Sequence, residues 1–288
     1  MDTRQARILY YEHATAMAYL AVERPDGTHS IGSAFHVGEG VFVTSRHVVE
    51  GNIIREIKIT EAIAISTREY FTNVEKRDAT EEEIQNYDKL MAGPTGKPRL
   101  WRHYLPPLEL ASGPYFAREP DLDVAVFRVK EIHSAAAVVK LGVHFDDWVY
   151  RAEWRLSDAI VLGYPPVPMV NLPTLIAAKA EIHTHVTPRH SNAVHFLLSA
   201  TPRGGFSGGV AIYEDGTALG VVTSSLNMNY EPEQLGFFAV LSIEAIMSCL
   251  IANRLYPEVQ REFSKSILEI DPVPMIESLY PLDGDADK

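Results

Sequence analysis

A serine that stands among glycines is the residue of this chain best suited to nucleophilic chemistry. Ser207 lies in the glycine-rich segment 203–209, which follows a strand-like apolar run at 194–198. Glycines adopt backbone angles that other residues reach only at a cost, so they leave the hydroxyl unshielded and let neighbouring N–H groups converge. A nucleophile for acyl transfer, placed beside an oxyanion hole, needs this arrangement. An ordinary serine in a turn is the structural alternative.

The order of the acid, the base and the serine separates two serine-hydrolase architectures. Residues 205–209 also fit the G-x-S-x-G pattern of α/β-hydrolases, which place the acid and then the histidine after the serine. All 11 histidines of this chain precede Ser207, and the last of them is His195. The α/β-hydrolase interpretation therefore lacks a base. The chain can supply only the opposite order, which is histidine, aspartate, serine.

Two strand-like segments upstream of the serine supply a base and an acid. The apolar segment 40–44 runs toward His47, and the alternating segment 121–129 begins with two aspartates. His47 would take the proton of the serine hydroxyl and pass it to the leaving group, while Asp123 would orient the imidazole and stabilise its charged form. Asp121 lies two residues earlier, on the same face of an extended segment, and is the rival acid.

These residues, in this order, resemble those of trypsin-like serine proteases of the chymotrypsin fold, nearest to the bacterial HtrA-type branch. Further matching stretches lie at 32–35, 161–165, 219–223 and 236–240, so that the resemblance spans roughly residues 15–250. It favours Asp123 over Asp121, because the family places its acid directly before a Val-Ala-Val strand. It implies a serine endopeptidase that works without a cofactor or metal and acts on a protein or peptide substrate.

The fold implied by the resemblance is all-β, with two Greek-key, six-stranded β-barrel lobes. The peptidase domain is expected over 1–255, with an N-terminal lobe at about 15–130 and a C-terminal lobe at about 135–241. A C-terminal helix is expected over 242–255. Residues 256–288 are an acidic, proline-containing extension, too short for the PDZ domain that many HtrA-type proteases carry.

Residues 60–118 are the part of the chain least like the family, and they suggest an insertion into the N-terminal lobe. Residues 80–90 begin with a capping residue and acidic side chains and are followed by Gly-Pro, which predicts a surface helix. A proline- and glycine-rich loop follows at 94–114. We interpret the insertion as a surface decoration, and a lid or docking element that regulates access to the active site is the alternative.

The resemblance also assigns an oxyanion hole, formed by the backbone N–H groups of Gly205 and Ser207. The substrate pocket would be lined by Thr201, Thr223, Ser224, Ser225 and Gly236. No acid stands at its base, so a small or medium apolar side chain is expected there, and not Arg or Lys. In digestive trypsin-like enzymes an aspartate before the serine pairs with a freed N-terminus. Phe206 occupies that position, so regulation is expected from a partner protein, the insertion or loop ordering.

Composition narrows the partners and the compartment. The chain has 288 residues, is 46% hydrophobic and has a net charge of −12, without a basic cluster. Nucleic acid is therefore not an expected partner, because phosphate binding needs concentrated Lys and Arg. A single cysteine fits a reducing compartment, and no apolar run is long enough for a membrane anchor or leader. We expect a cytoplasmic protein that does not bind membranes.

Two further groups of residues have both a chemical and a structural interpretation. His183, His185, His190 and His195 are close in sequence, as zinc ligands sometimes are, but no cysteine or carboxylate pattern accompanies them. We interpret the four histidines as solvent-facing strand residues and Cys249 as part of an apolar helix.

A catalytically silent, protease-like binding protein remains the alternative function, because a collapsed oxyanion loop would leave all three catalytic residues in place. An esterase that uses the same residues would differ only in its substrate.

Overall fold

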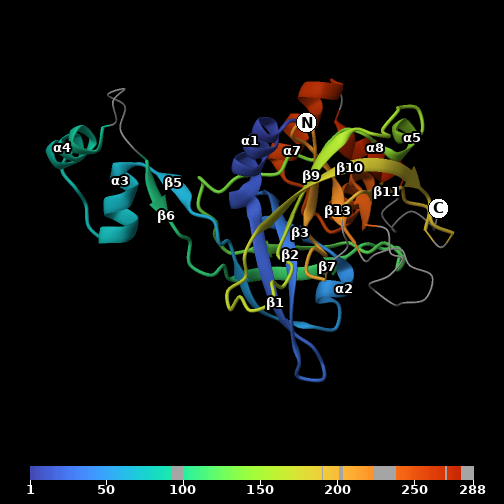
Figure 1. Cartoon of the computed structure of the whole chain (residues 1–288), viewed down its shortest axis with the longest axis horizontal. Helices are drawn as coiled ribbons and strands as arrows, with labels where there is room; N and C mark the ends of the chain where they lie inside the picture. The colour runs from blue at the N-terminus through green and yellow to red at the C-terminus, as the bar shows by residue number, and fades with distance from the viewer. Residues whose placement is uncertain (93–99, 190, 201–203, 224–237, 270, 280–288) are drawn as a thin grey trace, which may run out of the picture.

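Two six-stranded antiparallel sheets form the body of the protein, and a computed structural model describes them (Figure 1). The described residues are 1–92, 100–189, 191–200, 204–223, 238–269 and 271–279. The N-terminal sheet has the order β4 (Ile53–Lys58), β1 (Met17–Glu23), β2 (His29–Gly38), β3 (Val41–Thr44), β8 (Ala125–Val129), β7 (Leu110–Phe116). The C-terminal sheet closes into a barrel of β10 (Ile176–Val186), β11 (His195–Leu198), β14 (Phe238–Ser242), β13 (Ala218–Val222), β12 (Val210–Tyr213) and β9 (Asp158–Gly163).

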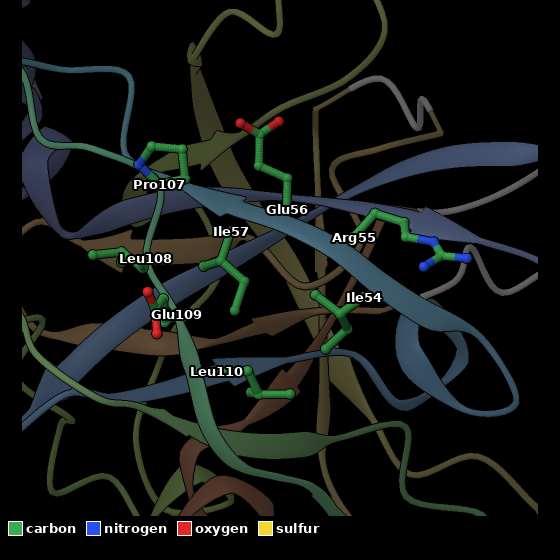
Figure 2. Close-up of a pocket in the computed structure, with 8 residues that line it drawn as sticks. All are labelled: Ile54, Arg55, Glu56, Ile57, Pro107, Leu108, Glu109 and Leu110. Atoms are coloured by element: carbon green, nitrogen blue, oxygen red, sulfur yellow. The ribbon is translucent and has the colours of Figure 1, made fainter.

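The N-terminal sheet does not close into a barrel, so the expectation of two six-stranded barrels is wrong for this lobe. Its edge strands β4 and β7 approach each other at a single bridge, where Leu108 N–H donates to Ile57 C=O at 2.7 Å. Pro107, next to it, has no N–H to extend the ladder. A cavity of about 410 Å³ separates the two edges, and side chains from 54–57 and 107–110 line it (Figure 2). The result is an open half-barrel.

The described part of the insertion before residue 104 forms a small unit that projects from the body (Figure 1), whereas Leu110–Phe116, expected as loop up to 114, is strand β7 of the N-terminal sheet. The elements of the small unit are β5 (Ile63–Ile65), β6 (Trp101–His103), α3 (Thr67–Tyr70), a π-helical turn (Phe71–Glu75) and α4 (Glu81–Met91). Tyr70 stacks on Trp101 with ring centroids 4.1 Å apart, and Phe71 packs edge-on against Tyr87. Thr80 caps α4, as the sequence predicts. In Figure 1, α3 and α4 lie on the side of the molecule away from α2 (Arg46–Val49), which favours a surface decoration over a lid.

Helices at both ends of the chain pack on the sheets. Helix α1 (Thr3–His13), followed by a short 3₁₀ turn (Ala14–Ala16), precedes β1, and α5 (Asp146–Val149) lies between the lobes in sequence. The C-terminal helix expected over 242–255 is found as α6 (Ile243–Ala252). Two more helices follow, α7 (Glu258–Leu268) and α8 (Pro272–Leu279), where only an acidic extension was expected. Among the residues described, no helix combines the length and apolar character that crossing a bilayer requires.

Helix α7 ties the two lobes together through one buried side chain. Gln260 is 1% exposed, and its amide donates to the carbonyls of Val37 at 2.7 Å and Val139 at 2.8 Å. Its carbonyl oxygen accepts from Leu141 N–H at 2.9 Å. Val37 belongs to β2, while Leu141 forms a parallel bridge to Ala218 of the C-terminal barrel. Three of the four hydrogen-bonding positions of the Gln260 amide are thus used between the lobes.

Replacing Gln260 should therefore destabilise the whole fold. A Gln260→Leu substitution keeps the volume but leaves three buried backbone groups without a partner, so we expect the free energy of unfolding to fall by about 2–5 kcal/mol. Urea unfolding followed by circular dichroism measures it. Gln85→Leu, at an exposed position on α4, is the matched control and should change little. Equal stability of the two variants would contradict this role of Gln260.

Candidate active site

His47 and Asp123 meet because neighbouring strands present them side by side. Strand β3 ends at Thr44, whose partner on β8 is Ala125. His47 follows on the one-turn helix α2, and not at the strand end that the sequence predicts. Its Nδ1 lies 2.7 Å from Asp123 Oδ2, and its backbone N–H donates to Asp123 Oδ1 at 3.0 Å. One carboxylate thus holds both the ring and the main chain of the histidine.

This contact determines which ring nitrogen of the neutral histidine is free. An ionised carboxylate only accepts hydrogen bonds, so His47 Nδ1 carries the proton and Nε2 is the acceptor. The side chains of His47 and Asp123 are 44% and 21% exposed, so the ring is open to solvent while its partner is largely covered. The pair can therefore accept a proton at Nε2 while the carboxylate holds the ring in place.

Asp121 does not share this position. The sequence predicts an extended segment from Asp121 onward, and that expectation is wrong for 121–124, which precede β8. The chain turns here, with Leu122 N–H donating to Glu119 C=O at 3.1 Å, and β8 begins only at Ala125. Asp121 is exposed, while Leu122 is buried. Within the described contacts of His47, the carboxylate is that of Asp123.

The turn that carries Ser207 packs directly on the N-terminal sheet. Ser207 C=O accepts from Ser33 N–H at 2.9 Å, and Gly208 N–H donates to Val222 C=O at 2.8 Å. Gly208 has φ +81°, and a Cβ there would lie 2.1 Å from Ser33 O and 2.3 Å from Thr44 Oγ1. Only glycine fits this conformation and this space. The backbone beside Ser207 is thereby placed against Thr44 at the end of β3, three residues before His47.

The backbone contacts at 207 and 208 place the Ser207 turn beside the end of β3, the strand that leads to His47. Within the described residues, the hydrogen bond of the His47 ring goes to Asp123, and none joins it to the Ser207 hydroxyl. Bonds of this kind often tighten only when substrate binds. The N–H groups of Gly205 and Ser207 donate to no backbone carbonyl among the described residues.

Phe206 anchors the turn by burial. Its side chain is 5% exposed and packs edge-on against Phe238, with ring centroids 5.8 Å apart. Gly163 makes room for it, because a Cβ there would lie 2.8 Å from Phe206 Cδ1. Burying an aromatic ring of this size contributes about 1.5–3 kcal/mol. The Phe206–Phe238 contact thus occupies the position at which digestive trypsin-like enzymes have an ion pair between an aspartate and the N-terminus.

Two hydroxyl groups next to the site, which no sequence motif indicates, also bridge the segments that build it. Ser45 Oγ donates to Val222 C=O at 2.6 Å, and Thr44 Oγ1 donates to Ser33 C=O at 2.7 Å. Both residues are fully buried. The only sequence signal for these bridging bonds is that Thr44 and Ser45 are polar residues at the end of an otherwise apolar strand.

Most of the predicted substrate pocket lies outside the described residues. This applies to Thr201, Ser224, Ser225 and Gly236. Thr223 is described and buried, and its N–H donates to Ala239 C=O at 3.1 Å. The preference for an apolar side chain therefore stays a prediction.

The histidines near β10 do not share one environment. His183 is exposed, His185 packs against Tyr150 with ring centroids 5.1 Å apart, and His190 lies outside the described residues. His195 is 6% exposed, so the solvent-facing interpretation is wrong for it, because β11 is buried along its whole length. Burial lowers the pKa of His195. In the described part of the chain, no three His, Cys, Asp or Glu side chains gather as metal ligands do.

Cys249 lies on α6 and is buried in the hydrophobic core. Its side chain is inaccessible to solvent, and burial raises the pKa of the thiol to about 12. A thiol of that kind stays protonated at neutral pH and does not act as a nucleophile.

Comparisons with known proteins agree with this geometry. A family described as "Trypsin-like peptidase domain" matches residues 32–221, which include His47, Asp123 and Ser207. A search of curated proteins finds no match. The Rv3671c protease from M. tuberculosis, in its active form, superposes with a TM-score of 0.54 at 16% identity, over 86% of each chain. The HtrA-type protease AlgW with a tripeptide superposes with a TM-score of 0.50 at 16% identity, over 84% of this chain and 61% of that one. These likenesses show the fold, and the family match, which spans about two thirds of the sequence, shows that the chain belongs to the trypsin-like peptidase family.

Proposed function

We propose that the protein is a serine endopeptidase that uses Ser207, His47 and Asp123. The observation that carries this proposal is the two-point contact of Asp123 with His47, which fixes the ring with Nε2 free. The contact of the Ser207 backbone with β2 supports it, because it brings the glycine-rich turn against the strand next to β3, which leads to His47. Membership of a peptidase family implies a protein or peptide as substrate.

The reaction would proceed in two halves. As Ser207 Oγ attacks the scissile carbonyl, His47 Nε2 takes the hydroxyl proton, and the N–H groups of Gly205 and Ser207 bind the oxyanion. His47 then gives this proton to the leaving amine, and an acyl-enzyme remains on Ser207. Water attacks the acyl group with His47 again as base, and the serine is restored. No step needs a metal or a cofactor.

A fluorophosphonate probe tests the nucleophile directly. We expect wild-type protein to be labelled covalently at Ser207, because the probe reacts with a serine that a base activates. Ser207→Ala removes the nucleophile and His47→Ala removes the base, so labelling of both should fall below detection. Mass spectrometry of the labelled peptide measures the site. Folded wild-type protein that stays unlabelled would favour the protease-like binding protein, and labelling that survives in Ser207→Ala would overturn the assignment.

The two neighbouring aspartates give a matched test of the acid. Asp123→Asn keeps the shape but no longer holds the correct imidazole tautomer, so we expect the labelling rate to fall by roughly 10⁴-fold, as such a change does in other enzymes with this triad. Asp121→Asn changes an exposed side chain and should keep the rate within about twofold. Stopped-time gel fluorescence measures both rates. Similar losses in the two variants would remove the special role of Asp123.

Substrate preference is tested with peptides that differ only at the residue before the cleaved bond. We propose a neutral pocket, so substrates with Ala, Val or Leu at that position should be cleaved at least about tenfold more efficiently than those with Arg or Lys, whose charge would be buried unpaired. The ratio of kcat/KM values from chromogenic release measures this preference. Faster cleavage after Arg or Lys would show that a carboxylate reaches the pocket.

A further inference from the structure

Ser33 is a fully buried polar residue in β2 of the N-terminal lobe, and its contacts belong to the C-terminal lobe. Its Oγ donates to Gly205 C=O at 2.6 Å and accepts from Tyr164 N–H at 2.8 Å. Its own N–H donates to Ser207 C=O at 2.9 Å. The two C-terminal segments lie 131 and 172 residues away from Ser33 along the chain. Ser33 thus joins three segments: strand β2, the residue that follows β9, and the turn 204–209, here called the nucleophile turn.

The direction of each hydrogen bond is unambiguous. A backbone N–H only donates and a carbonyl only accepts, so the hydroxyl must accept from Tyr164 and must place its single proton on Gly205 C=O. The hydroxyl therefore cannot rotate without losing a bond in a site from which water is excluded. Ser33 C=O is also engaged, because Thr44 Oγ1 donates to it at 2.7 Å. Ser33 is itself held in place.

We propose that Ser33 is a positioning residue for the oxyanion hole, an inference that rests on the proposed peptidase function. Gly205 and Ser207 are the two residues whose N–H groups would bind the oxyanion, and Ser33 holds the carbonyl of each. The peptide units that follow these residues are thereby fixed. Without these bonds the turn can rotate, which misdirects the donors or brings a carbonyl oxygen toward the developing negative charge.

The opposite side of Gly205 is closed by the same segment that bonds to Ser33. Gly205 has φ +90°, and a Cβ there would lie 2.6 Å from Tyr164 O and 2.7 Å from Pro165 Cα. Its carbonyl is therefore held from the β2 side, while its Cα rests against the chain at 164–166. Ser33 fixes the spacing between the segment at 164–166 and the turn at Gly205, because its hydroxyl bonds to both Tyr164 and Gly205.

Kinetics of Ser33 variants test this role in the full-length protein. Ser33→Ala should lower kcat and the rate of fluorophosphonate labelling by about 10- to 100-fold, because alignment of the oxyanion donors acts in the transition state, while KM stays within about twofold. Ser33→Thr keeps the hydroxyl and should recover most of the rate. Ser30→Ala, on the same strand, removes a hydroxyl whose partner is the exposed Arg24 side chain, and should match wild type.

Amide hydrogen exchange gives a readout that does not depend on activity. In Ser33→Ala, a peptide covering 204–209 should exchange faster than in wild type, while a peptide from β14 keeps its protection, which separates local loosening from global destabilisation. Unchanged kcat in Ser33→Ala with wild-type exchange over 204–209 would overturn the positioning role. If wild-type protein is not labelled by the probe, the peptidase proposal fails, and the exchange measurement alone decides whether Ser33 holds the turn.

Discussion

The site depends on one close approach between main chains. Gly208 lies against the backbone of Ser33 and the side chain of Thr44, and a Cβ there would come to 2.1 Å from Ser33 O and 2.3 Å from Thr44 Oγ1. His47 and Asp123 flank strands of the N-terminal sheet, whereas Ser207 belongs to the C-terminal lobe. Because backbone meets backbone here, the spacing of Ser207 and His47 is set by rigid strands and not by flexible side chains. Any residue larger than glycine at 208 would clash with Ser33 O and Thr44 Oγ1 and force the turn or these strands to shift.

Strand β2 is the common support of this arrangement. At its middle, Ser33 holds the nucleophile turn, and at its end Val37 accepts a hydrogen bond from Gln260 of α7. Tyr164 adds a third tie, since its N–H bonds to Ser33 while its hydroxyl donates to Met17 C=O on β1 at 3.1 Å. Burial raises the pKa of this hydroxyl, which stays neutral and keeps its proton for the bond. The lobes are thus joined at several points around the site.

The sequence predicts those parts that depend on local pattern. The order of His47, Asp123 and Ser207, the glycines around the serine and the helix that Thr80 caps all follow from residue types and short spacings. The open N-terminal sheet does not, because it depends on how Ile57 meets Leu108 across the whole insertion. Periodicity along a strand carries no information about such distant pairing.

The same limit applies to the site itself. Ser33 in β2 looks like a small residue tolerated in an apolar strand, and its partners at 164 and 205 become visible only in three dimensions. Asp121 and Asp123 differ because the chain turns before β8, a feature that alternation alone cannot locate. Residues whose role is made by contacts between lobes are therefore the ones that sequence patterns miss.

The anchors of the nucleophile turn share a physical character. Phe206 is held by apolar burial, Gly205 and Ser207 by hydrogen bonds to Ser33, and Gly208 by a hydrogen bond to Val222. None of these contacts contains a charged group. Salt screens ion pairs and pH titrates them, but neither acts on neutral hydrogen bonds and buried rings in the same way. Because the turn is ordered by neutral contacts within the fold, its alignment does not require a new charged chain end, and this distinguishes it from a turn that an N-terminal ion pair must order.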